Sequence, residues 1–291
     1  MPTTQAPTNS IHPKASIGAV HLTVSDLGRA LNFYQPVLGF QLHKRDNGVA
    51  HLGAGGADLL VLTEQPGAQR FIRGRSGLYH FAVLVPSRLE LARSLRRMAE
   101  AQVPLDGFSD HLVSEAIYLP DPDGNGIEVY RDRPRSEWRD ARGNFRMGSE
   151  PLDIDGVTAE LNAHPEPAGQ LDPATVIGHV HLHVADIAQA EQFYLGALGF
   201  DLMARYGPTA SFVSAGGYHH HLGFNTWAGV GAPPPPPDAV GLRHFEVRLP
   251  NAEAINQTVD RARAAGLTME ERADGLLVRD PSHNALVLRQ A

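Results

Sequence analysis

Two histidines and one glutamate stand in strand-like segments where polar side chains are unusual. His21 and His80 occupy the middle of two alternating runs, VHLTV and YHFAV, and Glu128 lies in the apolar run IEVY. A carboxylate buried there without a partner costs several kcal/mol, so it requires a cation, a metal or solvent. Two imidazoles and one carboxylate are the ligands of non-haem Fe(II) oxygenases and of some zinc and manganese sites. We therefore predict a metal site at His21, His80 and Glu128, provided that the segments carrying them curl into one cup. The alternative is that each histidine is a satisfied core residue.

Composition narrows the chemistry further. The 291 residues include no cysteine, which excludes disulfides, thiolate nucleophiles and cysteine-bound metal, and they include 15 histidines. A net charge of −7 argues against a general nucleic-acid or anionic-membrane binder. No apolar run approaches the roughly 20 residues of a membrane span, and the N-terminal segment is polar. We expect a cytoplasmic protein without nucleic-acid or membrane partners.

The chain contains an internal repeat. Residues 17–42 align without gaps on residues 177–202, with 14 of 26 positions identical. Two weaker pairs follow the same order, 77–86 with 241–250 and 121–130 with 280–289. Duplication of a domain made of two similar units is the simplest account. The four units begin near residues 17, 77, 177 and 241.

Each unit has the same expected order of elements: a short alternating strand, a helix and three further strands. The helix starts are marked by polar residues suited to N-caps, namely Asp26, Ser87, Asp186 and Asn251. Glycines suited to a left-handed residue follow the helices, namely Gly39, Gly199 and Gly266. We therefore predict an α+β fold with cup-shaped mixed sheets. Its segments are a polar extension (1–16), a first domain with the metal site (17–131), a surface connector with a short helical candidate at 156–162 (132–176) and a second domain (177–291).

The four-unit pattern, the strand histidines and the segment DHLVSEAIYLPDPDGNGIEVY at 110–130 resemble the vicinal oxygen chelate superfamily. That group includes glyoxalase I, bleomycin and fosfomycin resistance proteins and extradiol dioxygenases. The resemblance spans 17–131 and 177–291, and the two-domain build is similar to catechol 2,3-dioxygenase-like proteins. It implies a βαβββ fold in every unit and a divalent metal, usually Fe(II), held by His21, His80 and Glu128. The same ligands also accept Mn(II), Ni(II) or Zn(II).

The resemblance also implies a reaction and two catalytic residues. An extradiol enzyme cleaves a small aromatic diol with dioxygen. Tyr118, ten residues before Glu128, stands where such enzymes hydrogen-bond the bound catecholate, and a structural tyrosine is the alternative. His111 stands where an acid–base histidine could reach the substrate, and a solvent-facing loop histidine is the alternative. Homo-oligomers are common in this family.

The second half departs from this pattern. His181 and His244 match His21 and His80, but Val287 replaces the glutamate. A three-histidine metal site could use His181, His244 and one residue of 219–221, for which His221 is the candidate. A vestigial domain, whose histidines serve structure or line a pocket, is the favoured interpretation.

We predict a metal-dependent extradiol-type dioxygenase. One rival is another enzyme of the same fold, either a glyoxalase-like lyase or a thiol transferase. The lyase is disfavoured because the strand at 58–62 (DLLVL) supplies no fourth ligand. The other rival is a non-catalytic small-molecule binding protein.

Overall fold

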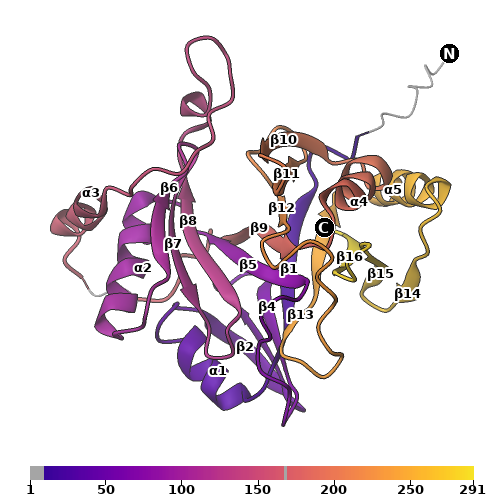
Figure 1. Ribbon diagram of the computed structural model, residues 1–291. Coiled ribbons are helices and arrows are strands. Elements are labelled where there is room, and N and C mark those ends of the chain that lie inside the picture. The colour runs from indigo at the N-terminus through magenta and orange to yellow at the C-terminus, as the bar shows by residue number, and fades with distance from the viewer. Residues whose placement is uncertain (1–9, 167–168) are drawn as a thin grey trace.

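The computed structural model describes residues 10–166 and 169–291 of the chain. These residues form four consecutive βαβββ units, as the sequence predicts (Figure 1). The α+β class is therefore confirmed. Residues 1–9 of the expected N-terminal extension lie outside the described part. Within the described residues, no helix has the length and apolarity needed to cross a membrane.

The four units share one order of elements and differ in the lengths of those elements. Unit 1 contains β1 (Ser16–Val24), α1 (Leu27–Tyr34), β2 (Gln41–Asp46), β3 (Val49–Gly53) and β4 (Asp58–Glu64). Unit 2 contains β5 (Gly77–Leu84), α2 (Arg88–Glu100), β6 (Gly107–Asp110), β7 (Ser114–Pro120) and β8 (Gly126–Asp132). Unit 3 contains β9 (Val176–His183), α4 (Ile187–Glu191) with a π-helical turn η3 (Gln192–Ala197), β10 (Asp201–Tyr206), β11 (Ala210–Ser214) and β12 (Leu222–Asn225). Unit 4 contains β13 (Gly241–Leu249), α5 (Ala252–Ala264), β14 (Glu270–Arg272), β15 (Gly275–Arg279) and β16 (Ala285–Gln290).

The two sheets do not follow the order of the units along the chain. One eight-stranded sheet joins units 1 and 4 in the order β14-β15-β16-β13-β1-β4-β3-β2, and the other joins units 2 and 3 in the order β10-β11-β12-β9-β5-β8-β7-β6. In each sheet, the two units join where their first strands pair antiparallel, with His21 opposite His244 and His80 opposite His181. His21 and His80, which we expected in one cup, therefore lie in different sheets. The first strand of every unit offers a similar free edge, so strand patterning cannot specify which two edges pair.

Helix packing, in contrast, joins units of the same half. Arg97 on α2 donates to the carbonyl of Leu38 after α1 at 3.2 Å, and Arg261 on α5 donates to the carbonyl of Leu198 after η3 at 2.5 Å. Each carbonyl precedes a glycine with positive φ, Gly39 and Gly199 at +85° and +82°, as expected for a helix end. The four predicted N-caps also accept backbone N–H groups of their helices. Helices within a half and sheets across halves together bury one continuous apolar core.

The connector between β8 and β9 is less superficial than the sequence suggests. It carries α3 (Ile154–Ala159) and η2 (Glu160–Ala163), close to the helical candidate at 156–162. Val157 is buried because α3 and η2 pack on α2 of unit 2. Trp138 is buried because it packs with Val113 of unit 2 and Tyr218 of unit 3.

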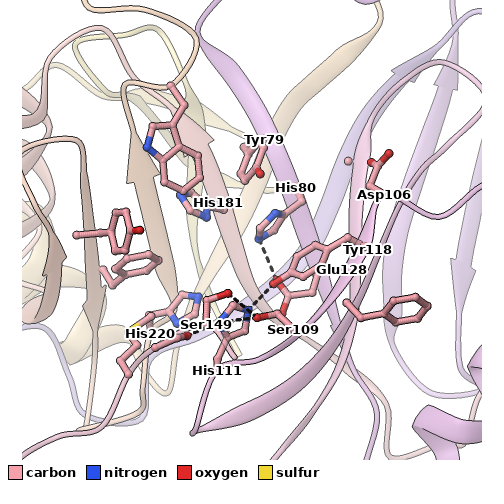
Figure 2. Close-up of a pocket in the computed structure, with 18 of the residues that line it drawn as sticks. Tyr79, His80, Asp106, Ser109, His111, Tyr118, Glu128, Ser149, His181 and His220 are labelled. Carbon is pink, nitrogen blue, oxygen red and sulfur yellow. Dashed lines mark hydrogen bonds and ion pairs between the residues drawn. The ribbon is translucent and has the colours of Figure 1, made fainter. Parts of the chain in front are cut away.

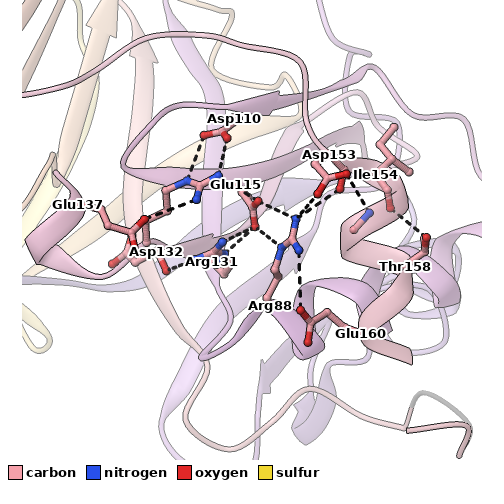
Figure 3. A network of polar contacts seen from close by, with 12 residues as sticks. Arg88, Asp110, Glu115, Arg131, Asp132, Glu137, Asp153, Ile154, Thr158 and Glu160 are labelled. Atoms are coloured by element: carbon pink, nitrogen blue, oxygen red, sulfur yellow. Dashed lines mark hydrogen bonds and ion pairs between the residues drawn. The ribbon is translucent and has the colours of Figure 1, made fainter. Parts of the chain in front are cut away.

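A network of ion pairs holds the connector against unit 2 (Figure 3). At its centre the Glu115 side chain on β7 is 1% exposed and accepts from three arginines, Arg88, Arg131 and Arg133. Arg88 also reaches Asp153 at the start of α3 at 3.1 Å. One buried carboxylate thus fixes three cationic side chains, and one of these holds the connector helix.

Replacing Glu115 with Ala should lower the free energy of unfolding by about 3 kcal/mol, because it leaves partly buried arginines without their shared partner. Urea unfolding followed by circular dichroism measures this change. Glu160→Ala is the matched control: Glu160 lies 3.8 Å from Arg88 with a 41% exposed side chain, so its loss should cost less than about 1 kcal/mol. Equal effects of the two substitutions would contradict a central role for Glu115.

Candidate metal centre

Three ligand-type side chains meet at the centre of the sheet formed by units 2 and 3. His80 on β5, Glu128 on β8 and His179 on β9 are all buried, and one ligand atom of each lies within 4.8 Å of the others. The Nε2 atoms of His80 and His179 are each 3.1 Å from Glu128 Oε2. They meet because Ala82 on β5 pairs with Glu128 on β8 and with His179 on β9, and His80 lies two residues before Ala82 on the same face of β5.

The electrostatics of this cluster suit a cation. Burial lowers the pKa of His179 to about 4, so its imidazole is neutral at pH 7 and can act as a ligand. Burial alone would raise the pKa of Glu128, but His179 and His80 outweigh it and hold that pKa well below its usual range. His80 Nε2 is buried beside the carboxylate without forming a hydrogen bond. An ionised carboxylate and two inward-facing imidazole nitrogens are the donors expected for a divalent metal, so these residues fit one.

His21, the third expected ligand, is not part of this cluster. It lies on β1 in the other sheet, where its ring stacks on His244 with centroids 4.0 Å apart. In the repeat alignment, Ala19 corresponds to His179 and Val287 corresponds to Glu128 of the candidate metal site. The sheet of units 1 and 4 therefore retains only His244 of the corresponding ligand set.

His179 is the ligand candidate that the sequence prediction omitted. It precedes His181 by two positions in the run HVHLH, so the two side chains share a face of β9. This row of histidines was the available signal. Only the pairing of β9 with β5, rather than of β1 with β5, assigns the site to His179.

The second candidate set, His181, His221 and His244, does not come together either. His244 belongs to the other sheet. His221 Nδ1 accepts the backbone N–H of Ala215 at 3.1 Å. His181 Nε2 accepts from the Asn225 amide at 2.9 Å. The latter two histidines therefore already have hydrogen-bond partners.

His111 and Tyr118 do lie beside the cluster, in the wall of a cavity of about 580 Å³ (Figure 2). His111 Nδ1 lies 2.8 Å from the Gly148 carbonyl, and Nε2 lies 2.6 Å from the Tyr118 hydroxyl. The carbonyl can only accept, so Nδ1 carries the proton and Nε2 accepts from Tyr118. Gly148 belongs to the connector, which therefore contributes to the site.

A second hydrogen-bonded chain ends in the same cavity. Asp132 accepts from His219 Nε2 at 2.8 Å, and His219 Nδ1 lies 2.9 Å from His220 Nδ1. With Asp132 as acceptor, the His219 proton is on Nε2, so His220 donates through Nδ1 and leaves its own Nε2 with a free lone pair. His220 lines the cavity and packs against His179 with centroids 4.1 Å apart. The sequence prediction considered residues 219–221 as metal ligands or, in the favoured interpretation, as structural or pocket-lining residues, and it gave His220 no proton-transfer role.

The chain belongs to the glyoxalase/bleomycin resistance protein/dioxygenase superfamily, whose family model matches residues 16–129 and 176–288. A curated relative, catechol-2,3-dioxygenase of Bacillus subtilis, is 47% identical over 282 residues, which cover 96% of this chain and 98% of the relative.

Solved structures share the fold at much lower identity. A Bacillus subtilis protein matches with a TM-score of 0.64 and 15% identity over 96% of this chain and 85% of its own. Glyoxalase I from Zea mays matches with a TM-score of 0.55 and 16% identity over 95% and 92%. These two matches support the architecture alone.

We expect about one divalent metal ion per chain, measured by elemental analysis after anaerobic purification and reconstitution. His179→Ala should reduce the bound metal several-fold, because it removes a neutral nitrogen ligand. His21→Ala, the matched control from the equivalent strand of the other sheet, should leave the metal content unchanged. Metal loss in His21→Ala with retention in His179→Ala would restore the original triad and refute this cluster.

The other sheet should contribute to acid sensitivity. Burial, followed by nearby His21 and Arg272, lowers the pKa of His244 to about 3. Between pH 3 and its ordinary value near 6.5, the unfolded chain binds a proton that the folded chain does not, so stability falls as the pH falls through this range.

His244→Asn removes this titration and should reduce the dependence of the unfolding free energy on pH by about 1.4 kcal/mol per pH unit between pH 4 and 6. Urea titrations of both proteins at several pH values measure the difference. Identical slopes would show that His244 binds its proton equally well in both states.

Proposed function

We propose that this protein is a metal-dependent extradiol dioxygenase that cleaves the ring of a catechol-like diol with dioxygen. The observation that carries the proposal is the buried His80–Glu128–His179 cluster, of which His80 and Glu128 line a cavity together with His111, Tyr118 and His220. The 47% identity with a catechol-2,3-dioxygenase over nearly the whole chain supports the same reaction. Family membership alone does not select it, because the superfamily also contains glyoxalases and resistance proteins.

The metal would be held by His80, Glu128 and His179, with Fe(II) as the proposed ion. When bound, it would supply the Lewis acidity that lowers the pKa of the diol and a common centre for diol and dioxygen. Three protein ligands leave further coordination positions for the reactants. The single carboxylate limits the negative charge of the site, which favours the binding of an anionic diolate.

Tyr118 and His111 would orient the diol. The Gly148 carbonyl fixes the His111 tautomer, so the Tyr118 proton points to His111 Nε2 and the lone pairs of the phenol oxygen remain available to a diol O–H. Burial and the nearby Glu128 raise the pKa of Tyr118 well above its usual value, so the phenol stays protonated at neutral pH. Tyr118 thus acts as a hydrogen-bonding group, and its partner His111 keeps it in place.

His220 would accept a proton from the diol. Its Nε2 carries a free lone pair because Asp132 and His219 fix the tautomers of the chain. Burial lowers the pKa of His220 well below its usual value, which keeps the imidazole neutral before substrate binds. The neutral imidazole is therefore in the form that can accept a proton from a diol in the cavity.

Anaerobically reconstituted Fe(II) protein should consume one dioxygen per catechol and place both atoms of ¹⁸O₂ in the ring-opened product, as followed with an oxygen electrode and mass spectrometry. Glu128→Ala should abolish turnover, because the metal loses its anionic ligand. His244→Ala is the matched control from the position equivalent to His80 in the other sheet, and it should retain turnover.

Failure of fully loaded protein to consume oxygen with catechol and substituted catechols would overturn the proposed reaction. Consumption of a thiol or isomerisation of a thiohemiacetal by the same sample would assign the site to one of the two rival enzyme classes.

A further inference from the structure

The cavity beside the metal cluster is much larger than one aromatic ring. It has a volume of about 580 Å³, whereas a cavity of about 150 Å³ is enough to hold benzene. If the diol ring binds at His80, Glu128 and His179, most of the remaining volume is free for a substituent on that ring.

One wall of this volume is aromatic and leads away from the metal ligands. The Tyr79 ring packs on His80 with centroids 4.9 Å apart, and its other side meets Trp227 edge to face at 5.3 Å. His181 contacts both Tyr79 and Trp227, at 5.1 and 5.5 Å, and Phe212 lies 5.5 Å from His181. All five residues line the cavity. Figure 2 shows Tyr79, His80 and His181 close together in this part of the site.

The buried side-chain amide of Asn225 holds this aromatic wall in place through hydrogen bonds. Asn225 donates to His181 Nε2 at 2.9 Å, and its oxygen accepts from His183 at 2.8 Å and from the Trp227 backbone N–H at 2.9 Å. The Trp227 indole N–H lies 3.3 Å from the Thr209 hydroxyl. Yet Trp227 and Tyr79 remain 47% and 39% exposed. Two aromatic side chains that are held in place and still partly exposed in a cavity are suited to a hydrophobic ligand, whose binding would remove that surface from water.

The charges around the wall favour a neutral ligand. Asp106 and Glu128 place two carboxylates in the lining, and the lining arginine, Arg205, is already paired with Glu191 at 2.7 and 3.0 Å. A carboxylated substituent would meet the negative charge of Asp106, because Arg205 is already paired and a bound metal would be offset by Glu128 and the diolate. An uncharged aromatic substituent avoids this cost.

We propose that Trp227 and Tyr79 form a distal subsite that selects diols carrying an uncharged aryl substituent over both unsubstituted catechol and carboxylated catechols. This selection rests on the proposed dioxygenase function, because that function places the diol ring at the metal cluster. Trp227 and Tyr79 are then specificity-determining residues that contact the substituent and not the reacting ring.

The test compares three substrates in the wild type and in Trp227→Ala: 3-phenylcatechol, catechol and 3,4-dihydroxybenzoate. The wild type should have the highest kcat/KM for 3-phenylcatechol and the lowest for the carboxylated diol. Trp227→Ala should reduce kcat/KM for 3-phenylcatechol about tenfold, mainly through KM, and change that for catechol by less than twofold. Phe71→Ala, a control at another exposed aromatic residue outside the cavity lining, should change neither.

A binding measurement separates this proposal from the proposed reaction. Trp227 is one of only two tryptophans, so 3-phenylcatechol should quench the fluorescence of the metal-free protein, and Trp227→Phe should remove most of that quenching. If no diol is turned over but this quenching persists, the reaction is refuted and the subsite stands. Equal losses for catechol and 3-phenylcatechol in Trp227→Ala, or no loss for either, would overturn the subsite.

Discussion

The site depends on one physical constraint, which is that an ionised carboxylate is buried in the middle of an apolar strand. Glu128 is 2% exposed, and the structure surrounds it with two imidazole nitrogens at 3.1 Å. A buried carboxylate flanked by two imidazole nitrogens is the donor set that a divalent cation takes, so the arrangement is suited to one. The cavity, the hydrogen-bonded phenol and the second histidine chain all lie around this point.

Duplication provided two sheets with the same plan, and only one keeps the ligand set. The corresponding positions of the other sheet hold Ala19, His244 and Val287. His244 has no corresponding ligands beside it and stacks on His21 instead. Since each sheet takes one unit from each half of the chain, the retained site combines ligands from both halves and cannot be assigned to either half alone.

The connector links fold and site in a way that its composition does not suggest. Glu115 and its arginines hold it against unit 2, and the Gly148 carbonyl then fixes the tautomer of His111. A connector outside the four repeated units can thus set the direction of a proton at the site. The same logic applies to Asp132, which follows the metal-cluster strand β8 and directs the tautomers of His219 and His220. In both examples, a residue that does not itself bind the metal or the substrate sets the proton position on a histidine.

The sequence by itself determined the four βαβββ units, their helix caps and the α+β class. Hydrophobic periodicity and capping are local signals, and the internal repeat shows the same signals in both halves of the chain. The sequence prediction also proposed His80, Glu128, His111 and Tyr118 as site residues, and these share one unit and therefore stay together in any pairing of the sheets. Only the tertiary structure decided that His179, and not His21, joins them. The free edges of the four first strands are similar, so the choice of partner depends on long-range packing of helices and sheets, which no local pattern records. The roles of His220 and of the connector depend on the same packing, since their contacts cross between units that are distant in the chain.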